Sequence, residues 1–411
     1  MKDSGIEWIG EIPEGWEVGQ IGQLYSERRT KVSDKDYPPL SVTMKGILPQ
    51  LSTAAKTDAH DDRKLVCKGD FAINSRSDRR GSCGISEQDG SISLINTVLQ
   101  PRGEMNPGYY NWLFHTSMFA DEFYKWGHGI VDDLWTTGWS DMKKIGVPVP
   151  SKCEQKQIAE HLNFECSNID TILSRTRSSI EEYKKLKQAV ITQAVTKGVR
   201  GEREMKDSGV EWTGEIPVNW TIQRFARVAE VKSNLVSPDN YLEYPQISPE
   251  NIEKDSGKLL LPCRTVAEVG VISGNHLFYK GQILYSKIRP KLNKVCIAPF
   301  DGLCSADMYP IESKNDTRYI MYCILSNGFL QQVSMITENR VKMPKINQVE
   351  LSKVLVAIPE TIAEQKEIAD YLDAKCAEID KLIAKKEQLV KELESYKKSL
   401  IYEVVTGKRE V

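Results

Sequence analysis

The sequence has few of the residues that build metal centres and disulfide frameworks. Its 411 residues include five histidines and nine cysteines, and no two of the cysteines form a Cys-x-x-Cys pair. An odd, scattered set of cysteines is a poor disulfide framework, and the histidines lack the spacing of zinc ligands. We therefore expect neither a bound metal nor a fold that depends on disulfides.

Long apolar runs and an excess of either charge are also missing. No run of about 18 apolar residues occurs, so the sequence predicts no membrane span. The first residues lack the basic and then apolar pattern of a signal peptide, and we expect a cytoplasmic protein. The formal net charge of −2 is not that of a free-standing nucleic-acid binder. Any DNA contact would need local basic patches or a partner that supplies positive charge.

The motifs of nucleotide-using enzymes are absent as well. The sequence contains no Gly-x4-Gly-Lys-Ser/Thr phosphate loop, no glycine-rich dinucleotide loop after a strand, and no segment typical of amino-methyltransferases. Glu182-Tyr183-Lys184 has the Glu-x-Lys spacing of some nuclease sites, but it lies on a predicted helix with no suitably placed aspartate. The sequence therefore predicts no active site and a protein that is not an enzyme.

The dominant feature that is present is an internal repeat. Residues 1–13 (MKDSGIEWIGEIP) return at residues 205–217 with two positions changed, and residues 154–170 return in altered form at residues 364–380. A period near two hundred residues is too long for a solenoid and indicates a duplicated domain. An apolar content of 40% and a charged content of 27% are ordinary for a folded protein of two or three domains.

Each copy reads as a short lead, a variable segment and a long helix. The leads carry Trp16 and Trp220, which we expect to anchor the domain cores. The variable segments are rich in short β-type runs bounded by Gly, Pro, Asp and Asn, which is typical of a mixed α/β domain. Short helices are expected at residues 107–126 and 317–335, and closing strands at 145–150 and 354–359. The predicted domains are residues 1–150, 151–204, 205–359 and 360–411.

The long helices carry apolar residues at multiples of seven, with a companion series three residues on. We assign to this seam Leu162, Ile169, Ile172, Tyr183, Leu186 and Val190 in the first copy, and Leu372, Ile379, Leu382, Leu389, Leu393, Tyr396 and Leu400 in the second. The narrow stripe favours an antiparallel coiled coil between the two helices; the alternative is two separate helices, each packed on its own domain. The predicted fold is α+β: two mixed α/β domains separated by this coiled coil, in a pseudo-twofold tandem repeat.

Two unlike domains on paired helices would suit a DNA duplex, which offers similar backbone geometry at two half-sites. Basic residues stand at matching places in both variable segments, where phosphate contact and base reading would need them. The candidates are Arg76, Arg79 and Arg80 in the first segment, Lys287, Arg289 and Lys291 in the second, and a further patch of Arg340, Lys342 and Lys345. Asn74, Ser75 and Asn293 are weaker candidates for reading base edges. The alternative for each cation is a solvated loop charge.

The chain resembles the specificity subunits of type I restriction–modification systems. The resemblance rests on Gly-Glu-Ile-Pro-x-x-Trp at 10 and 214, Glu-Gln-Lys-x-Ile-Ala at 154 and 364, Ile-Asp at 169 and 379, and Ala-Val-Thr-Lys-Gly at 194 with Val-Val-Thr-Gly-Lys at 404. It covers the whole length and implies two target-recognition domains, helices that space them, and a bipartite double-stranded DNA target. It also implies two docked methyltransferase subunits and a restriction subunit.

Under this resemblance the chain binds no cofactor itself, and S-adenosylmethionine, ATP and Mg²⁺ belong to the partner subunits. Apolar residues outside the seam, such as Ile158, Ile191, Leu355 and Ile401, would then serve either a partner interface or packing within the chain. Two other functions stay open at this point. They are a protein-interaction scaffold without DNA specificity and a self-sufficient endonuclease.

Overall fold

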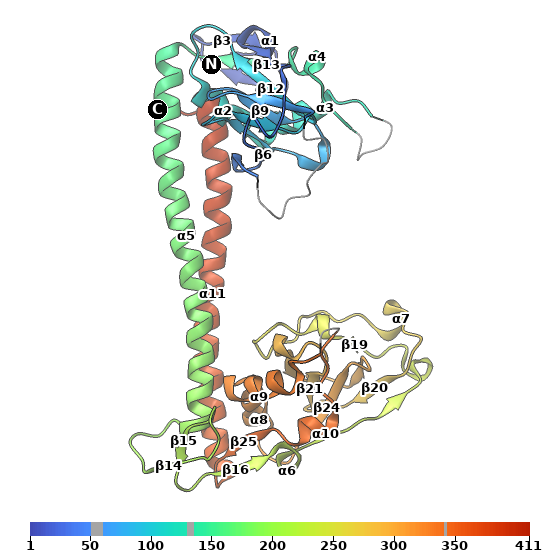
Figure 1. Ribbon diagram of the computed structural model, residues 1–411. Coiled ribbons are helices and arrows are strands. Elements are labelled where there is room, and N and C mark those ends of the chain that lie inside the picture. Colours follow the sequence, from blue (N-terminus) through green and yellow to red (C-terminus); the bar gives the residue numbers. More distant parts are fainter. Residues whose placement is uncertain (51–60, 130–134, 341–342) are drawn as a thin grey trace. The chain divides into compact units, whose positions relative to one another are not determined.

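A computed structural model describes residues 1–50, 61–129, 135–340 and 343–411. The chain divides into two compact units (Figure 1): unit 1 is Met1–Arg177 with Gln388–Val411, and unit 2 is Ser178–Glu387. Each unit holds one globular domain, called here head 1 (residues 1–150) or head 2 (residues 205–359). Each also holds a section of both long helices, α5 (Lys152–Lys197) and α11 (Ile362–Val405). The predicted α+β fold, with two mixed domains and two long helices, is confirmed.

Head 1 is built on a four-stranded antiparallel sheet of order β10-β9-β12-β4, with a second sheet of order β11-β8-β5. Two hairpin-like pairs, β1-β2 and β6-β7, and the pair β13-β3 complete it. Its strands are β1 (Lys2–Asp3), β2 (Glu11–Ile12), β3 (Glu17–Gln20), β4 (Tyr25–Glu27), β5 (Lys31–Val32), β6 (Leu40–Thr43), β7 (Gly46–Pro49), β8 (Arg63–Val66), β9 (Phe71–Asn74), β10 (Cys83–Ile85), β11 (Gly90–Ile92), β12 (Asn96–Pro101) and β13 (Gly146–Val149). Its helices are α1 (Ile21–Leu24), η1 (Ser77–Arg79), α2 (Pro107–Phe114), α3 (Ser117–Lys125) and α4 (Trp139–Met142).

Head 2 repeats this topology. Its main sheet has the order β22-β21-β24-β17, which matches β10-β9-β12-β4 strand for strand, and a second sheet has the order β18-β20-β23-β19. Its strands are β14 (Met205–Asp207), β15 (Glu215–Pro217), β16 (Thr221–Arg224), β17 (Ala229–Val231), β18 (Leu235–Val236), β19 (Gln246–Ile247), β20 (Asn275–Phe278), β21 (Ile283–Ser286), β22 (Val295–Ile297), β23 (Gly302–Cys304), β24 (Met308–Ser313) and β25 (Leu355–Ile358). Its helices are α6 (Phe225–Val228), η3 (Pro238–Tyr241), η4 (Pro249–Asn251), α7 (Val266–Val269), η5 (Pro290–Leu292), α8 (Thr317–Leu325), α9 (Asn327–Thr337) and α10 (Gln348–Ser352). The duplication therefore extends into the segments whose sequences have diverged.

Matching turns of the two heads have the same internal contact. The backbone N–H of Lys68 donates to Asp89 Oδ1 at 2.8 Å, and that of Lys280 donates to Asp301 Oδ1 at 2.7 Å. Each aspartate stands just before a strand of the second sheet, β11 or β23, so the contact ties the turn to that sheet. The expected closing strands are also present, because β13 pairs with β3 and β25 pairs with β16.

Each of the helical stretches expected at 107–126 and 317–335 consists of two short helices. Thr116 and Ser326 interrupt them in extended backbone conformations, and their hydroxyls accept hydrogen bonds from the N–H groups of Phe119 and Phe329. A side chain that caps the next helix ends the previous one. The break was missed because apolar residues continue across the cap.

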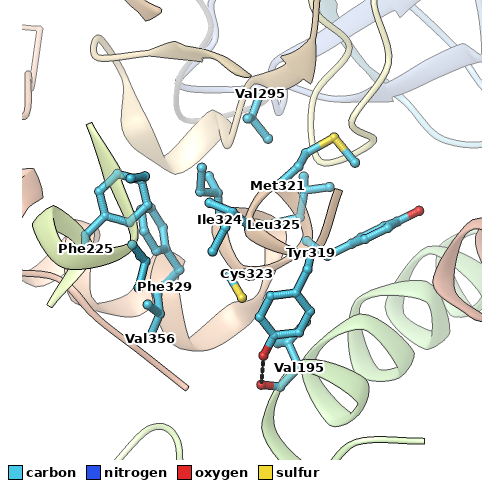
Figure 2. Close-up of a cluster of buried hydrophobic side chains, with 14 of the residues drawn as sticks. Val195, Phe225, Val295, Tyr319, Met321, Cys323, Ile324, Leu325, Phe329 and Val356 are labelled. Atoms are coloured by element: carbon cyan, nitrogen blue, oxygen red, sulfur yellow. Dashed lines mark hydrogen bonds between the residues drawn. The ribbon is translucent and has the colours of Figure 1, made fainter. Parts of the chain in front are cut away.

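The core of unit 2 contains the end of α5 (Figure 2). Tyr319 of α8 and Phe329 of α9 belong to one buried cluster, in which the rings of Phe329 and Phe225 lie 5.7 Å apart. The Tyr319 hydroxyl lies 3.3 Å from the carbonyl oxygen of Val195 and 2.8 Å from that of Ala357. Unit 1 has the equivalent contact, because the hydroxyl of Tyr109 donates to the carbonyl of Val405 at 2.7 Å. Each head is therefore completed by the last turns of the long helix that belongs to the other repeat.

The repeated tryptophans join each lead to the start of a long helix. Trp16 and Trp220 are 3% and 0% exposed. The indole N–H of Trp16 donates to Glu154 Oε1 at 3.0 Å, and that of Trp220 donates to Glu364 Oε1 at 3.2 Å. A buried indole needs a hydrogen-bond acceptor, so the repeated Trp and Glu form one structural pair.

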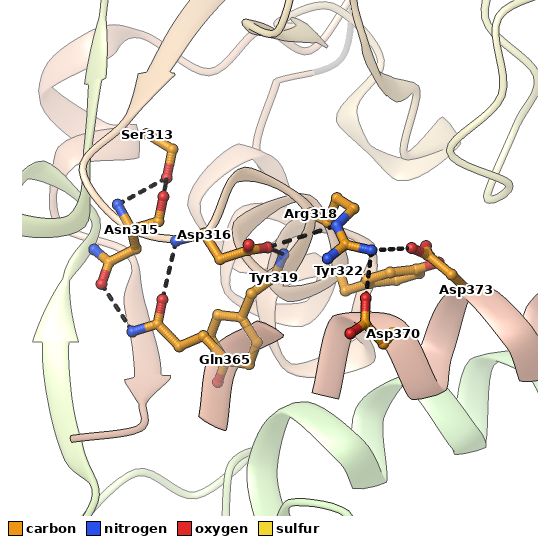
Figure 3. Close-up of polar contacts among 9 residues, drawn as sticks. All are labelled: Ser313, Asn315, Asp316, Arg318, Tyr319, Tyr322, Gln365, Asp370 and Asp373. Carbon is orange, nitrogen blue, oxygen red and sulfur yellow. Dashed lines mark hydrogen bonds and ion pairs between the residues drawn. The ribbon is translucent and has the colours of Figure 1, made fainter. Parts of the chain in front are cut away.

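The repeated Glu-Gln pair has a second role beside these tryptophan contacts. The side-chain oxygen of Gln155 accepts from the N–H of Asn106, which caps α2, and that of Gln365 accepts from the N–H of Asp316, which caps α8 (Figure 3). In unit 2, Arg318 adds ion pairs from α8 to Asp370 and Asp373 of α11. These contacts fix the short helices of each head on the long helix that follows it.

The long helices run antiparallel in unit 1. Asp170 of α5 lies 2.6 Å from Lys397 Nζ of α11, and Arg177, further along α5, forms an ion pair with Glu394, which lies earlier on α11. Residue numbers therefore rise along one helix as they fall along the other.

The same direction holds in unit 2. The ammonium of Lys386 lies 5.7 Å from the centre of the Tyr183 ring, and Lys187 Nζ lies 2.9 Å from Asp380 Oδ1. The predicted antiparallel pairing is thus present within each unit.

Two series of side chains form the seam between the long helices. The series at multiples of seven agrees with the prediction, and the companion series differs from it. Leu162, Ile169, Leu372, Ile379 and Leu400 are buried, with Tyr183, Val190 and Leu393 half-buried. The companion series lies four residues on, not three: it is Cys166, Leu173, Ile180 and Lys187 in α5, and Cys376, Ile383, Val390, Lys397 and Val404 in α11.

The predicted companion residues lie on the flank of the seam instead. Ile172 and Leu186 are each 48% exposed, Leu382 is 37%, Leu389 is 41% and Tyr396 is 46% exposed. The contact stripe of a coiled coil alternates steps of three and four residues, and apolar side chains stand at both steps here. The predicted placement of these five partly exposed residues in the seam is therefore wrong. We call these five residues the flank ridge.

Candidate nucleic-acid interface

The arginine loop of head 1 follows β9 and is held by a second segment. The backbone N–H of Ser77 donates to the carbonyl of Trp135 at 3.1 Å, and the N–H of Thr137 donates to the carbonyl of Ser75 at 3.0 Å. Arg76 forms an isolated antiparallel bridge with Thr136. Residues 75–77 and 135–137 therefore lie side by side like two strands. We call this pair of segments the double loop of head 1.

The three arginines of head 1 differ in their surroundings. Arg80 forms an ion pair with Asp121 of α3, and its guanidinium lies 5.6 Å from the centre of the Tyr124 ring. Arg79 lies 3.6 Å from Asp78 and is mostly exposed, while Arg76 is half-buried. Exposed ion pairs such as these are weak, so phosphate oxygens can replace the carboxylates.

Head 2 has the same arrangement after the equivalent strand, β21. The N–H of Arg289 donates to the carbonyl of Pro344 at 2.8 Å, and the N–H of Ile346 donates to the carbonyl of Lys287 at 2.9 Å. Ile288 forms an isolated antiparallel bridge with Lys345. Residues 287–289 and 344–346, which carry cations of the two patches predicted for this head, therefore form one double loop.

The cations of this double loop are partly engaged. The ammonium of Lys287 lies 5.2 Å from the centre of the Tyr309 ring, and Lys345 Nζ lies 2.9 Å from Asp307 Oδ1. Arg340 bonds to Glu350, and this hydrogen bond lowers the pKa of the Glu350 carboxyl.

Arg289 and Lys291 are exposed, and Arg289 has a positive φ of 45°. Lys342 lies outside the described residues. A strained, exposed arginine beside other cations is the kind of arrangement found at binding sites. The nine basic candidates remain predictions as DNA contacts.

Three weaker candidates are internal. Asn74 is 5% exposed and its side-chain oxygen accepts from the N–H of Arg76, while Ser75 is 6% exposed and hydrogen-bonds to Thr97 at 2.9 Å. Asn293 is 1% exposed and donates to the carbonyl of Leu325. These side chains hold the double loops in shape, so their interpretation as base readers is wrong for this conformation.

Two of the four apolar candidates for a partner surface are also internal. Ile158 is 4% exposed and Ile191 is 0% exposed, because each packs in the core of its own unit. Leu355 and Ile401 are half-buried. The exposed apolar side chains of the long helices instead include the flank ridge, Phe164 at 65%, Ile362 at 44% and Tyr371 at 39% exposed.

The Asp–Lys pairs between the long helices escaped the sequence analysis. The Ile-Asp repeat at 169 and 379 was noted, but the partners Lys397 and Lys187 were not. The sequence signal that could have revealed these pairs is a lysine within the apolar stripe of each helix, at Lys187 and Lys397. In the part of the chain that the structure describes, no helix is long and apolar enough to cross a membrane, and no group of three metal-ligating side chains converges.

Comparisons with known proteins agree with this architecture. Residues 217–392 match the family described as the type I restriction modification DNA specificity domain. The chain is 40% identical over 243 residues to the type I restriction enzyme EcoDI specificity subunit of Escherichia coli. That match covers 56% of this chain and 54% of the relative, so it spans about half the relative's length. The MjaVIII specificity subunit of Methanocaldococcus jannaschii is 24% identical over 424 residues, which cover 97% of this chain and 93% of that one.

Two solved structures share the fold. One, from a study of complex assembly and conformational transition of the type I R-M system, has a TM-score of 0.73 at 11% identity over 97% of this chain and all of that chain. The HsdS subunit of Thermoanaerobacter tengcongensis has a TM-score of 0.53 at 14% identity, with 97% and 98% of the two chains covered.

The fold defines a protein with two heads, each on a section of two long helices. Residues 217–392, which cover most of head 2 and part of α11, match the type I restriction modification DNA specificity family. The resemblance to type I specificity subunits is thereby confirmed.

Proposed function

We propose that this chain is the DNA-reading subunit of a type I restriction–modification complex, with one head for each half of a bipartite target. The observation that carries the proposal is the double loop. Both heads present it after the equivalent strand, β9 or β21, and both fill it with cations at positions where the sequences differ. Equal geometry with unequal side chains would let two heads read unlike sequences through similar phosphate contacts.

The chain would perform no catalysis itself. Two methyltransferase subunits would dock on the long helices and supply S-adenosylmethionine chemistry, and a restriction subunit would use ATP and Mg²⁺. The docking part of the proposal rests on the resemblance to type I specificity subunits, and the flank ridge would offer such a partner apolar side chains that are 37–48% exposed. Partner subunits would also supply the positive charge that this chain, with its net charge of −2, lacks.

Mapping methylated adenines in cells with and without the gene tests the function. We expect one bipartite motif to lose its methylation when the gene is removed. A methylation pattern that does not change would contradict the specificity role. Exchange of residues 14–150 for another such head should then alter one half of the motif, and a change in both halves would argue against independent heads.

Joint replacement of Arg76, Arg79 and Arg80 by glutamine tests the double loop of head 1. We expect weaker binding of the complex to its target and a shallower dependence of affinity on salt, because fewer counterions are released. Lys31, which pairs with Asp62 elsewhere on head 1, gives a control variant, Lys31→Gln. Affinity and salt dependence equal to those of wild type would remove this loop from the interface.

A further inference from the structure

The carboxylate of Asp380 connects both long helices and head 2 at one point of unit 2. Lys187 Nζ of α5 lies 2.9 and 3.0 Å from its two oxygens. Lys258 Nζ lies 2.6 Å from Oδ2, and this lysine belongs to the head 2 loop between η4 and α7. Lys187 is 6% exposed, so its charge depends on this carboxylate for compensation.

The same loop has a second contact with α5. The side-chain nitrogen of Gln188 donates to the carbonyl of Asp255 at 3.4 Å. Asp255 has a positive φ of 56°, and the N–H of Glu253 donates to the carbonyl of Lys258 at 3.0 Å, so residues 253–258 form a closed turn. The tip and the end of this turn both contact the helix pair.

Unit 1 has the helix-to-helix part of this arrangement without the contact to a head. Asp170, the repeat equivalent of Asp380, binds Lys397, the equivalent of Lys187, at 2.6 and 2.7 Å. Among the residues that the structure describes, Lys397 is its only cationic partner. The Asp170 side chain is 58% exposed, whereas that of Asp380 is 20% exposed, because the turn at 253–258 covers the latter.

We propose that Asp380 is a positioning residue that holds head 2 on its helix pair and thereby limits the spacing of half-sites that the complex accepts. The spacing part rests on the proposed function. The ion pair with Lys187 fixes the register of the two helices, as polar seam residues do in coiled coils. The ion pair with Lys258 transmits that register to head 2. A head released from this contact would tolerate half-sites at more than one separation.

Four variants separate these contributions. Lys258→Met removes the contact to head 2 and leaves the seam pair. Lys254→Met is its matched control in the same turn, because Lys254 is exposed and pairs with Asp255. Asp380→Asn removes both ion pairs, and Asp170→Asn is its matched control, because it removes a seam pair alone.

Hydrogen exchange on the purified full chain tests the contact directly. We expect amide exchange across residues 251–260 to be faster in Lys258→Met and Asp380→Asn, and to equal wild type in Lys254→Met and Asp170→Asn. Equal exchange in all five proteins would overturn the proposed contact.

Methylation of duplexes whose spacer is one base pair shorter or longer than the natural one tests the consequence. With methyltransferase subunits present, we expect Lys258→Met to lower the preference for the natural spacer by about fivefold, the effect of one ion pair. An unchanged preference together with faster exchange would overturn the positioning role. Absence of any bipartite methylation by wild type would overturn the proposed function instead, and the exchange experiment would still decide the contact.

Discussion

At the scale of the residue, the repeated positions maintain the junctions where each long helix enters a head. Gly198 follows α5 and Gly407 follows α11, with φ values of 78° and 70°. A Cβ on Gly407 would lie 2.4 Å from Pro13 Cδ, whereas one on Gly198 would meet the flexible end of Arg203 at 3.0 Å. The glycine after the second helix stands one position earlier in the repeat than Gly198 and has an additional packing role at its junction.

Gly407→Ala should destabilise unit 1 more than Gly198→Ala destabilises unit 2. Both changes place a Cβ in the left-handed region, at a cost of about 1 kcal/mol. The contact with Pro13 should add about 1–3 kcal/mol to the first change. Gly209→Ala is the control, because Gly209 has a φ of 69° and nothing within 4 Å of its Cβ position. Thermal and denaturant unfolding would show the order, and equal losses at positions 407 and 209 would contradict it.

The Asp380 carboxyl should contribute to stability in a pH-dependent way. Burial raises its pKa, but the hydrogen bonds from Lys258 and Lys187 outweigh burial, and the pKa lies below its ordinary value. A lowered carboxyl pKa stabilises the fold above the unfolded-state value, and that contribution is lost as pH falls through the folded-state pKa. The stability difference between wild type and Asp380→Asn should therefore be full near neutral pH and shrink below about pH 4. A constant difference over this range would contradict the prediction.

At the scale of the element, the long helices show how a heptad pattern can be assigned to the wrong flank. The companion series begins with Cys166 and Cys376, small residues that are buried where the prediction assigned the larger Ile172 and Leu382 to the seam. Burial raises the pKa of both thiols to about 11, so they pack as neutral side chains. The larger leucines and isoleucines outside the seam are then left for solvent or a partner.

Ile379→Ala and Leu382→Ala distinguish the two series. Ile379 is 6% exposed and Leu382 is 37% exposed, although the residues are three positions apart on one helix. We expect a loss of about 2–4 kcal/mol in unfolding free energy for Ile379→Ala and less than about 1 kcal/mol for Leu382→Ala. Under the proposed function, the second variant should instead weaken methyltransferase docking. Equal losses of stability would return Leu382 to the seam.

At the scale of the whole molecule, each compact unit draws on both repeats. Unit 1 combines the first head with the last residues of the chain, and unit 2 combines the second head with the end of α5. Within each unit the parts from the two repeats come together at the lead, where Trp16 or Trp220 is buried. This explains why the leads stayed nearly identical while the double loops diverged.

Matched insertions in both long helices should change the accepted spacer. Three heptads added after Arg177 and after Glu387 keep the alternation of the seam. They lengthen each helix by about 31 Å, or about nine base pairs of duplex, which is nearly one helical turn. We expect methylation of targets with a correspondingly longer spacer. A single added heptad would turn one half-site around the duplex and should methylate poorly. An unaltered spacer preference would show that the helices do not set it.

The sequence by itself determined the repeat, the two heads, the order of their parts and the existence of two long helices. These follow from local patterns: identical leads, apolar periodicity and Gly or Asp at turns. It also placed cations in both double loops, because charge at equivalent repeat positions is visible without coordinates.

The tertiary structure alone decided which helix face is buried, that Thr116 and Ser326 end helices, and that Asn74, Ser75 and Asn293 are internal. It also decided that residues 287–289 meet residues 344–346. Each of these depends on contacts between residues far apart in the chain. The apolar periodicity of each helix fits a companion series three residues on and one four residues on equally well. Only packing against the second helix shows which of the two series is buried.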